Sequence, residues 1–207
     1  MWELIQSAGW PIYPLLLASV IGTSLIFERF WALRRSLVIP DQTLENAITL
    51  LRQKSTKNAV EVIDQFSEQS ALSNILAAAL RHRLTQPLAN RQSYTQILEE
   101  AGRNASLSLE RFLNAIGTIS AIAPLLGLLG TVIGMIEMFA SQAGTYQPQA
   151  MAQGISIALY NTAFALVIAI PALVAYRYFK NKVNRYLVEM EGYSSYLLEL
   201  ILLDQQR

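Results

Sequence analysis

A nearly charge-free stretch of 65 residues, Phe112 to Tyr176, limits what this chain can fold into. Glu137 is its one charged side chain, and a polar segment, SQAGTYQPQAMAQ, divides it into apolar runs at about residues 113–139 and 155–176. A helix rises about 1.5 Å per residue, so about 20 residues cross a hydrocarbon core of about 30 Å. Both runs are long enough, and the polar segment between them can only turn the chain back. The sequence therefore predicts a transmembrane hairpin.

The basic residues fall into two blocks, and this segregation predicts how the chain lies in a membrane. All 16 lysines and arginines lie in residues 29–111 or 177–207. Basic residues gather on the cytoplasmic side of bacterial membrane proteins. We therefore expect both blocks inside the cell, and the N-terminus and the loop 140–154 outside it. The net charge of +1 hides this asymmetry and gives no indication of nucleic-acid binding.

The first span is expected near the N-terminal end of the sequence. Residues 12–27 carry no charge, and the segment ERFWALRR follows them. Arg34 and Arg35 would stop translocation, which leaves the N-terminus outside. Glu28 and Arg29 lie close enough to the end of the span to extend their side chains to the lipid headgroups.

Four helices are expected in the first cytoplasmic block, because its apolar residues recur at helical spacing. Ser70 is expected at the start of the third helix, and Asn90 or Ser93 at the start of the fourth. No strong breaker separates the fourth helix from Phe112, so we expect it to continue into the second span as one helix. No stretch alternates with a period of two, so no strand is expected.

The third span is also expected to continue beyond the membrane. Apolar residues from Val183 to Ile201 recur at near-heptad spacing, which predicts one helix from the third span to about Leu203. This stripe could pack on the chain's own cytoplasmic helices or on a neighbouring copy. The sequence as a whole predicts an all-α integral membrane protein with three transmembrane helices and a cytoplasmic bundle of long helices that extend out of the membrane. The expected segments are a periplasmic N-terminus (1–11), transmembrane helices (12–33, 113–139 and 155–176), a cytoplasmic helical region (34–112), a periplasmic loop (140–154) and a cytoplasmic helical tail (177–207).

Few side chains in this sequence could carry covalent chemistry. The chain has no cysteine, which excludes disulfides and thiolate metal sites. His82, its one histidine, lies in the basic segment RHR and is expected to face solvent, without a catalytic or metal role. The glycines of GLLGTVIG lie inside an apolar run with no preceding strand, so they favour close helix packing over dinucleotide binding. We expect no enzymatic activity, no metal and no cofactor.

Single polar residues inside the apolar runs are the candidate functional residues, because polar groups in hydrocarbon are costly unless they are paired or face a cavity. Two helical faces are apolar apart from one hydroxyl: Thr131 with Pro124, Leu128, Met135 and Met138, and Thr162 with Ala158, Ala165 and Ala169. Such a face suits the lining of a narrow pore or a seat for another helix, although a lone threonine can instead bond to its own helix. Pro124 and Pro171 each leave a helix carbonyl without its usual donor, which gives a local polar spot.

The two apolar runs resemble a known family of membrane proteins. APLLGLLGTVIGM, followed by GISIALYNTAFALVIAIPALVAY, is similar to the motifs of the ExbB/TolQ/MotA proton-channel family, and to ExbB-type proteins most. The similarity extends to ERFWALRR and to the layout of three spans, so it covers essentially the whole chain. The resemblance implies a proton path that involves Thr131, Thr162, Glu137, Asn161, Pro124 and Pro171. It also implies a seat for a partner helix at Leu128, Met135, Ala158 and Ala165.

The same resemblance implies a function and a set of partners. The chain would form a pentameric homo-oligomer in the lipid bilayer of the inner membrane, around a single-span ExbD-type protein. Proton flow through this complex would drive a TonB-type protein for nutrient import across the outer membrane. Two alternatives remain open: a TolQ-like motor subunit for envelope maintenance, and a membrane scaffold that holds a partner helix without conducting.

The sequence departs from the family's pattern at three positions. Ile157 stands where many relatives carry a glutamate, Asn161 where threonine or alanine is common, and Ala165 where glycine is frequent. If the two threonines are level, Glu137 lies at about the depth of the absent glutamate. One hypothesis is therefore that Glu137 replaces the lost carboxylate near the outer mouth of the channel. The alternative is that its side chain extends to the outer headgroups.

Overall fold

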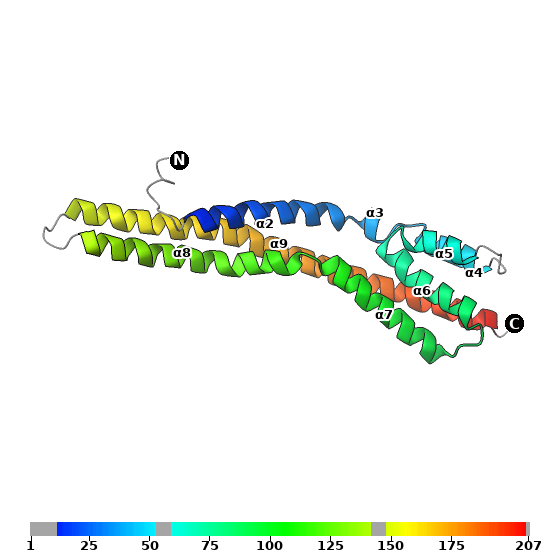
Figure 1. Cartoon of the computed structure of the whole chain (residues 1–207). Helices are drawn as coiled ribbons and strands as arrows, with labels where there is room; N and C mark the ends of the chain where they lie inside the picture. The colour runs from blue at the N-terminus through cyan, green and yellow to red at the C-terminus, as the bar shows by residue number, and fades with distance from the viewer. Residues whose placement is uncertain (1–11, 53–58, 142–147, 206–207) are drawn as a thin grey trace. The chain divides into compact units, whose positions relative to one another are not determined.

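The chain is helical throughout the part that the structure describes (Figure 1). The computed structural model describes residues 12–52, 59–141 and 148–205, which contain eight helices and no strand. The predicted all-α fold is therefore confirmed. The predicted periplasmic N-terminus (1–11) and the centre of the predicted 140–154 loop lie outside the described residues. The helices are α2 (Ile12–Ala32), α3 (Arg35–Val38), α4 (Thr43–Arg52), α5 (Ala59–Ser67), α6 (Ala71–Thr85), α7 (Arg91–Glu110), α8 (Leu113–Ser141) and α9 (Pro148–Gln205).

Two compact units make up the described chain, and three of its helices are long and apolar enough to cross a membrane. The membrane unit comprises residues 12–29 and 112–178, and the bundle unit comprises residues 30–111 and 179–205. The three candidate spans lie in α2, α8 and α9. α9 has 58 residues and is one helix that contributes to both units, as its heptad spacing predicts.

Small residues allow α2, α8 and α9 to lie side by side in the membrane unit (Figure 1). Leu15 of α2 forms a buried cluster with Ala123 of α8 and with Ala165 and Ala169 of α9. Apolar side chains gain little by leaving lipid, so helices in a membrane associate through close van der Waals contact of small residues. The alanines of this cluster therefore bring three helix backbones near one another around a single leucine.

α6 is the central helix of the bundle unit, because α4, α5 and α7 all pack against it. A helix covered on several sides buries residues around its circumference and not along one stripe alone. His82 is one of these residues: it is 9% exposed, its Nε2 lies 2.8 Å from the hydroxyl of Ser93, and its ring meets that of Tyr94 edge-on. The prediction that His82 faces solvent is wrong, because α7 covers this side of α6.

Side-chain caps mark two helix starts at the predicted positions. At the start of α6, the hydroxyl of Ser70 accepts a hydrogen bond from the backbone N–H of Ser73, at 3.0 Å. At the start of α7, the side-chain oxygen of Asn90 accepts one from the backbone N–H of Ser93, at 2.9 Å. Each cap satisfies a backbone donor that helix geometry leaves without an internal partner.

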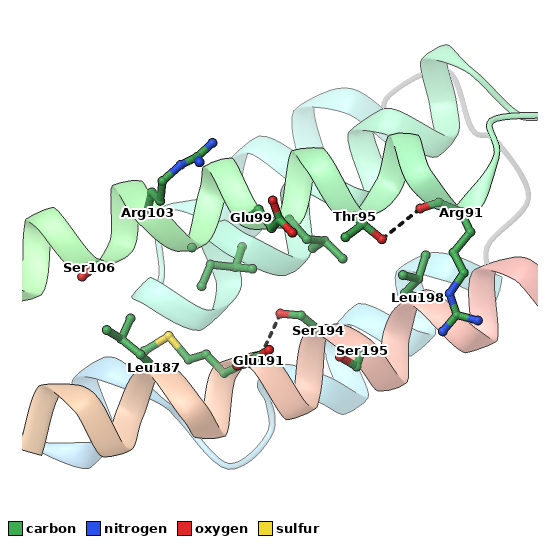
Figure 2. A pocket seen from close by; sticks show the side chains of 14 residues that line it. Arg91, Thr95, Glu99, Arg103, Ser106, Leu187, Glu191, Ser194, Ser195 and Leu198 are labelled. Carbon is green, nitrogen blue, oxygen red and sulfur yellow. Dashed lines mark hydrogen bonds between the residues drawn. The ribbon is translucent and has the colours of Figure 1, made fainter.

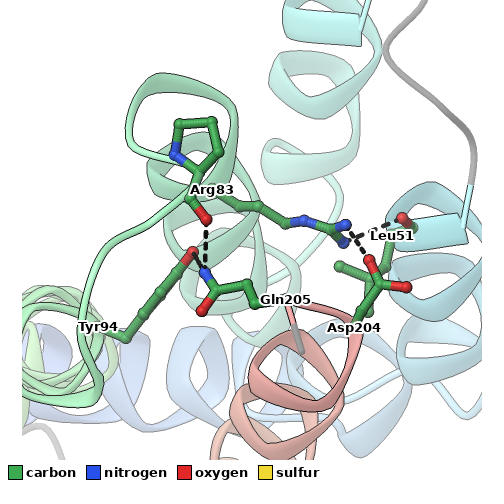
Figure 3. Close-up of polar contacts among 6 residues, drawn as sticks. Leu51, Arg83, Tyr94, Asp204 and Gln205 are labelled. Atoms are coloured by element: carbon green, nitrogen blue, oxygen red, sulfur yellow. Dashed lines mark hydrogen bonds and ion pairs between the residues drawn. The ribbon is translucent and has the colours of Figure 1, made fainter. Parts of the chain in front are cut away.

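Polar contacts fasten the last turn of α9 within the bundle unit (Figure 3). Arg83 of α6 forms an ion pair with Asp204. The amide nitrogen of Gln205 donates hydrogen bonds to the carbonyl of Pro87, at 2.8 Å, and to the hydroxyl of Tyr94, at 3.2 Å. The side chain of Tyr94 is itself fully buried. The end of α9 is therefore held by α6, by α7 and by the loop between them.

α7 and α8 are two helices, so the prediction that they form one is wrong. α7 ends at Glu110, Arg111 is extended with a ψ of 136°, and Phe112 has a φ of 64°. A positive φ is uncommon for a residue with a side chain and costs a bulky one about 1–2 kcal/mol. In the described part of the chain, Phe112 is the only residue other than glycine with a positive φ. Neither glycine nor proline marks this break, so the sequence carries no local signal for it.

Arg29 lies at this break, and it does not extend to the headgroups as expected. Its side chain is only 7% exposed. Its Nη2 donates a hydrogen bond to Oε1 of Glu28, at 2.6 Å, and its Nε donates to the other carboxylate oxygen. Its guanidinium carbon lies 5.4 Å from the centre of the Phe112 ring. A cation over an aromatic face is worth about 0.5–2 kcal/mol, which is comparable with the penalty for the backbone of Phe112.

Tyr94 makes the bundle unit sensitive to alkaline pH. Burial raises the pKa of its hydroxyl above the ordinary value of 10.0, although the charge of Arg83 and the hydrogen bond from Gln205 act in the opposite direction. A pKa raised in the folded state gives stabilisation that is complete below the ordinary pKa and is lost as the pH rises through the folded-state pKa. We expect the unfolding temperature to fall more steeply above about pH 10 in the wild type than in Tyr94→Phe. Thermal unfolding of the detergent-solubilised proteins at several pH values measures this, and parallel curves would contradict it.

Candidate functional site

α8 and α9 run antiparallel in the membrane unit, and glycines on α8 let their backbones come close. The facing pairs along the contact are Gly127 with Ala165, Gly130 with Asn161, Gly134 with Ala158, and Met138 with Gly154. A Cβ built on Gly127 would lie 2.4 Å from the Cβ of Ala165, which is far inside van der Waals contact. Glycine is therefore required at position 127 for the two helices to approach as closely as they do.

The same register brings Thr131 and Thr162 to one depth of the membrane unit. Because Gly130 faces Asn161, the two threonines are level to within about two residues, or about 3 Å along the helix axes. Both side chains are half-buried. The hydroxyl of Thr131 donates a hydrogen bond to the carbonyl of Leu128 in its own helix, at 2.7 Å. A hydroxyl used in this way can still accept a hydrogen bond from water or from a partner's side chain.

Three of the sequence-predicted site residues lie inside the contact between α8 and α9. Asn161 is 1% exposed, and Ala158 and Ala165 are also buried. α8 of the same chain covers all three through its glycines. The small surface that the sequence assigns to a partner helix on this part of α9 is therefore occupied by α8. A small helical face suits a partner chain or a neighbouring helix equally well, so the sequence alone does not distinguish them.

The exposed part of the surface predicted to contact a partner helix lies on α8. Leu128 is 57% exposed and Met135 is also exposed, on the helical face that carries Thr131. Pro124 lies on the same face and is half-buried. This face therefore offers apolar side chains around one hydroxyl, as the spacing predicts, and α9 does not cover its exposed leucine and methionine.

Both span prolines lie inside continuous helices, Pro124 in α8 and Pro171 in α9. A proline has no N–H, so Pro124 cannot donate to the carbonyl of Ser120, and Pro171 cannot donate to that of Val167. Pro171 is exposed, in contrast to the half-buried Pro124. Each carbonyl is a hydrogen-bond acceptor at a depth where the rest of the helix backbone is satisfied internally.

Glu137 is an exposed side chain of α8, displaced from Thr131 toward the loop by about 9 Å. The register of α8 against α9 places it about level with Ile155. That position is about 3 Å farther toward the loop than the backbone of Ile157, whose side chain lies outside the described part of the structure. The depth that the Glu137 hypothesis requires is thus met to within one helical turn.

A groove in the bundle unit is a second concave feature (Figure 2). It has a volume of about 420 Å³ and lies between α7 and α9. Side chains of both charge signs line it, together with hydroxyls: Arg91, Thr95, Glu99, Arg103 and Ser106 from α7, and Glu191, Ser194 and Ser195 from α9. This mixture favours no single ligand charge. Nowhere in the described ranges do three His, Asp or Glu side chains gather as they would around a metal ion.

The membrane unit offers hydrogen-bonding groups and very few titratable ones. Glu137 is the one charged side chain between Phe112 and Tyr176. A proton relay needs a group that gains and loses a proton near the working pH, and a threonine hydroxyl does not ionise there. The two threonines can therefore hold water or a carboxylate by hydrogen bonds, but neither can be the titrating group of a proton relay.

Comparison with known proteins decides which class of membrane protein this is. Residues 67–192 match the family described as the MotA/TolQ/ExbB proton channel family. The chain belongs to this family. The matched range includes all of α6, α7 and α8, and α9 as far as Gly192, so the proton channel family's match covers both helices that carry the candidate site.

Individual members of the proton channel family align with almost the whole chain. The biopolymer transport protein exbB1 of Vibrio cholerae is 31% identical over 94% of this chain and 86% of its own length. The biopolymer transport protein ExbB of Salmonella typhimurium is 30% identical, over 90% of this chain and 80% of its own length. That of Pseudomonas putida is 26% identical, over 97% of this chain and 63% of its own length. The predicted resemblance to ExbB-type proteins is therefore confirmed.

Sequence reasoning does not find the contact between Arg29 and Phe112, although it lies at the start of a helix that carries the candidate site. The two residues are far apart in the sequence. Arg29 lies in ERFWALRR, a segment that resembles this proton channel family, but Phe112 lies in none of the motifs that carry the resemblance. Only the packing of α2 beside α8 brings them together.

Gly127→Ala is expected to destabilise this proton-channel protein, because the added methyl group would overlap Ala165. Overpacking of this kind costs about 1–3 kcal/mol. The double variant Gly127→Ala/Ala165→Gly should recover part of that loss, because it removes the overlap with the methyl group of Ala165 but leaves the added Cβ 3.1 Å from the Cα of Thr162 and 3.2 Å from the carbonyl oxygen of Asn161. Thermal unfolding of the purified proteins measures both effects.

Gly102→Ala in α7 is the matched control, because nothing lies within 4 Å of the position of its added Cβ. Replacing an open helical glycine by alanine stabilises a helix by about 0.5–1 kcal/mol. A Gly127→Ala protein at least as stable as Gly102→Ala would show that α8 and α9 are not in close contact.

Proposed function

We propose that this chain is an ExbB-like proton-channel and motor subunit of a bacterial inner membrane. Together with a single-span ExbD-type partner, it converts the proton-motive force into work on a TonB-type protein for nutrient import across the outer membrane. The observation that carries the proposal is the pair Thr131 and Thr162, at one depth of two closely packed spans in a member of the proton channel family. The positions match those of the channel threonines in the ExbB resemblance.

This channel needs a titrating carboxylate at the depth of the two threonines, and a partner chain would supply it. The exposed Leu128 and Met135, beside the half-buried Thr131, give α8 a face that an apolar helix can cover. A partner span with an aspartate at the depth of the two threonines would supply the titrating group. Threonine hydroxyls and ordered water would then hold that carboxylate in place and pass protons to it. Without the partner, the chain should conduct protons poorly.

A pentameric ring of this chain would enclose the partner helix. The N-terminus lies in the periplasm and the bundle unit in the cytoplasm, because all 16 basic residues fall in residues 29–111 or 177–207, on one predicted side of the membrane. In this orientation the membrane potential drives protons from the periplasm toward the bundle unit. Each charge that crosses releases about 2.3 kcal/mol per 100 mV.

Two alternative functions predict different results. A TolQ-like subunit would conduct protons in the same way but maintain the envelope, so its loss would make the envelope leaky and leave nutrient import intact. A non-conducting scaffold would keep its function when an uncoupler collapses the membrane potential. Ile157, in place of the glutamate of many relatives, favours the scaffold, whereas Thr131 and Thr162 favour conduction.

Thr131→Val and Thr162→Val are each expected to lower proton flux about tenfold, the size expected when one positioned hydrogen bond is lost. Valine keeps the shape of threonine and removes its hydroxyl. The flux is measured in liposomes that hold the chain and its ExbD-type partner, with an imposed potential and a dye that reports internal pH. Liposomes without the partner should show little flux.

Thr118→Val is the matched control for both variants. Thr118 lies on α8 and donates a similar hydrogen bond to its own helix, to the carbonyl of Asn114 at 2.8 Å. Its loss should leave the proton flux unchanged. Equal effects of all three variants, or strong selective flux from the chain without a partner, would contradict the proposed function.

Glu137→Gln tests whether this residue replaces the absent acid near the outer mouth. If it does, the proton flux should fall about tenfold or more, because glutamine keeps the shape but cannot exchange a proton near neutral pH. Full flux in Glu137→Gln would show that the carboxylate only contacts the outer headgroups. Flux through Thr131→Val in the same liposomes gives the reference for a damaged channel.

A further inference from the structure

We propose that the outer face of α9 in the bundle unit docks into the groove between α7 and α9 of a second copy of this chain. The outer face consists of Val188, Gly192, Tyr196, Glu199 and Leu203. The groove is the cavity of about 420 Å³ in the bundle unit. This inference rests on the proposed function for the arrangement of the copies in a ring, and on the single chain for the two surfaces.

The outer face exposes apolar side chains although this part of α9 belongs to the bundle unit. Val188, Tyr196 and Leu203 are 50–69% exposed. Their spacing of eight and seven residues puts them on one side of the helix. That side lies about 150° around the helix from Leu197 and Ile201, which are buried. A row of exposed apolar side chains on one side of a helix indicates a contact with another molecule.

The near-heptad stripe of α9 is already used inside the chain. Val183, Met190, Leu197 and Ile201 are at most 1% exposed. The spacing of these residues fits packing on the chain's own helices and packing on a neighbouring copy equally well. Their burial within a single chain shows that the chain's own helices cover them. A neighbouring copy can therefore meet this part of α9 only on another face.

Gly192 lies in the middle of the outer face. Among the described residues, nothing comes within 4 Å of a Cβ built on this glycine. Glycine weakens a helix relative to alanine, so the packing of a single chain gives no reason for glycine at this position. A missing side chain does allow the backbone of another molecule to approach closely. The position of Gly192 therefore supports a docked neighbour on the outer face.

The groove between α7 and α9 offers a complementary surface (Figure 2). Apolar side chains line it, among them Ile75, Leu98 and Met190, and the exposed Arg91 and Thr95 lie at its rim. Its volume of about 420 Å³ falls within the range of about 300–1,000 Å³ that is typical of protein binding pockets. A tyrosine combines a large apolar ring with one polar end, which suits an apolar groove with a polar rim.

Both surfaces include residues of α9, and they do not overlap. Leu187, Glu191 and Leu198, which line the groove, lie about 130° around the helix from the outer face. One chain can thus dock its outer face on one neighbour and receive the outer face of another neighbour in its groove. Head-to-tail contacts of this kind generate rings when the rotation between copies closes. The bundle unit therefore carries both halves of the interface that a ring needs.

Charge complementarity supports a second copy as the occupant of the groove. Copies in a ring that cross one membrane in the same direction lie side by side at one height. Arg91 and Leu198 line one end of the groove, and Ser106 and Leu187 line the other (Figure 2). Glu199 follows Leu198, so Glu199 of one copy is level with Arg91 of the next. Both side chains are exposed in the single chain, and their opposite charges can pair across the interface.

Two single-cysteine chains test this contact, because the chain has no cysteine of its own. Full-length Arg91→Cys and Glu199→Cys chains carry different tags and are produced together, and their membranes are treated with a mild oxidant. A disulfide forms only where two Cα atoms come within about 7 Å. We expect a linked pair that contains both tags, and no linked pair in membranes that hold only one of the two variants.

Tyr196→Ser in the Glu199→Cys chain tests the outer face separately from the cysteines. We expect the yield of the mixed pair to fall about fivefold or more, as for the loss of a tyrosine anchor from an interface. Leu107→Ser in the same chain is the matched control, because Leu107 is an exposed apolar residue of α7 that belongs to neither surface. It should leave the yield unchanged. Immunoblots of each tag control for the amount of protein in the membrane.

Three results would overturn the proposal. They are linked pairs from the Glu199→Cys chain alone, which would show a symmetric contact of two outer faces, the absence of mixed pairs, and equal losses in Tyr196→Ser and Leu107→Ser. Proton flux in liposomes judges the proposed function separately. Mixed pairs without proton flux from the wild-type complex would overturn the proposed function and leave the docking intact. Normal proton flux without mixed pairs would overturn the docking alone.

Discussion

The close contact between α8 and α9 is the constraint on which the membrane unit depends. Apolar side chains gain little free energy by leaving lipid. Two spans therefore stay together only where their backbones come near enough for extensive van der Waals contact. Gly127 against Ala165 is the tightest point of that contact. From it follow the register of the two helices, the common depth of Thr131 and Thr162, and the burial of Asn161. A looser contact would leave these polar groups at depths unrelated to one another.

The distribution of charge complements this packing. The spans hold a single acidic side chain beyond the first helix, and the basic residues begin where the apolar runs end. Under the proposed function, a channel built in this way would hold hydrogen-bonding groups in fixed positions and leave the titration to Glu137 or to a residue of a partner chain. A seat for a partner's carboxylate would also account for isoleucine at position 157, because such a seat would not need an acid of its own at that depth.

Polar contacts stabilise the bundle unit, where water is available and buried polar groups must form hydrogen bonds. Several of them fasten α9 to its neighbours. The hydroxyl of Tyr186 donates to the carbonyl of Leu33, at 3.1 Å, and Glu189 pairs with Arg35. Lys180 pairs with Glu110, at the end of α7. α9 is one helix in both units, so these contacts hold the same element that carries Thr162.

The sequence by itself determined the features that depend on composition and period. Apolar runs of sufficient length gave the three candidate spans, and heptad spacing predicted that α9 continues beyond its span. Ser70 and Asn90 marked two helix starts because their side chains cap their own backbone. The family motifs placed Thr131 and Thr162 in the candidate site. Each of these signals lies within one short segment, so no knowledge of neighbouring helices is needed.

Tertiary structure alone decided what covers each helical face. Period analysis puts Ala158 and Ala165 on one face of α9, but only the approach of α8 shows that this face is filled. His82 is buried because α7 returns across α6, which no property of the RHR segment reveals. The ring of Phe112 lies 5.4 Å from the guanidinium carbon of Arg29, which belongs to a helix distant in the sequence. A residue's own segment fixes the direction of its side chain, whereas the residues that contact this side chain come from a remote part of the chain.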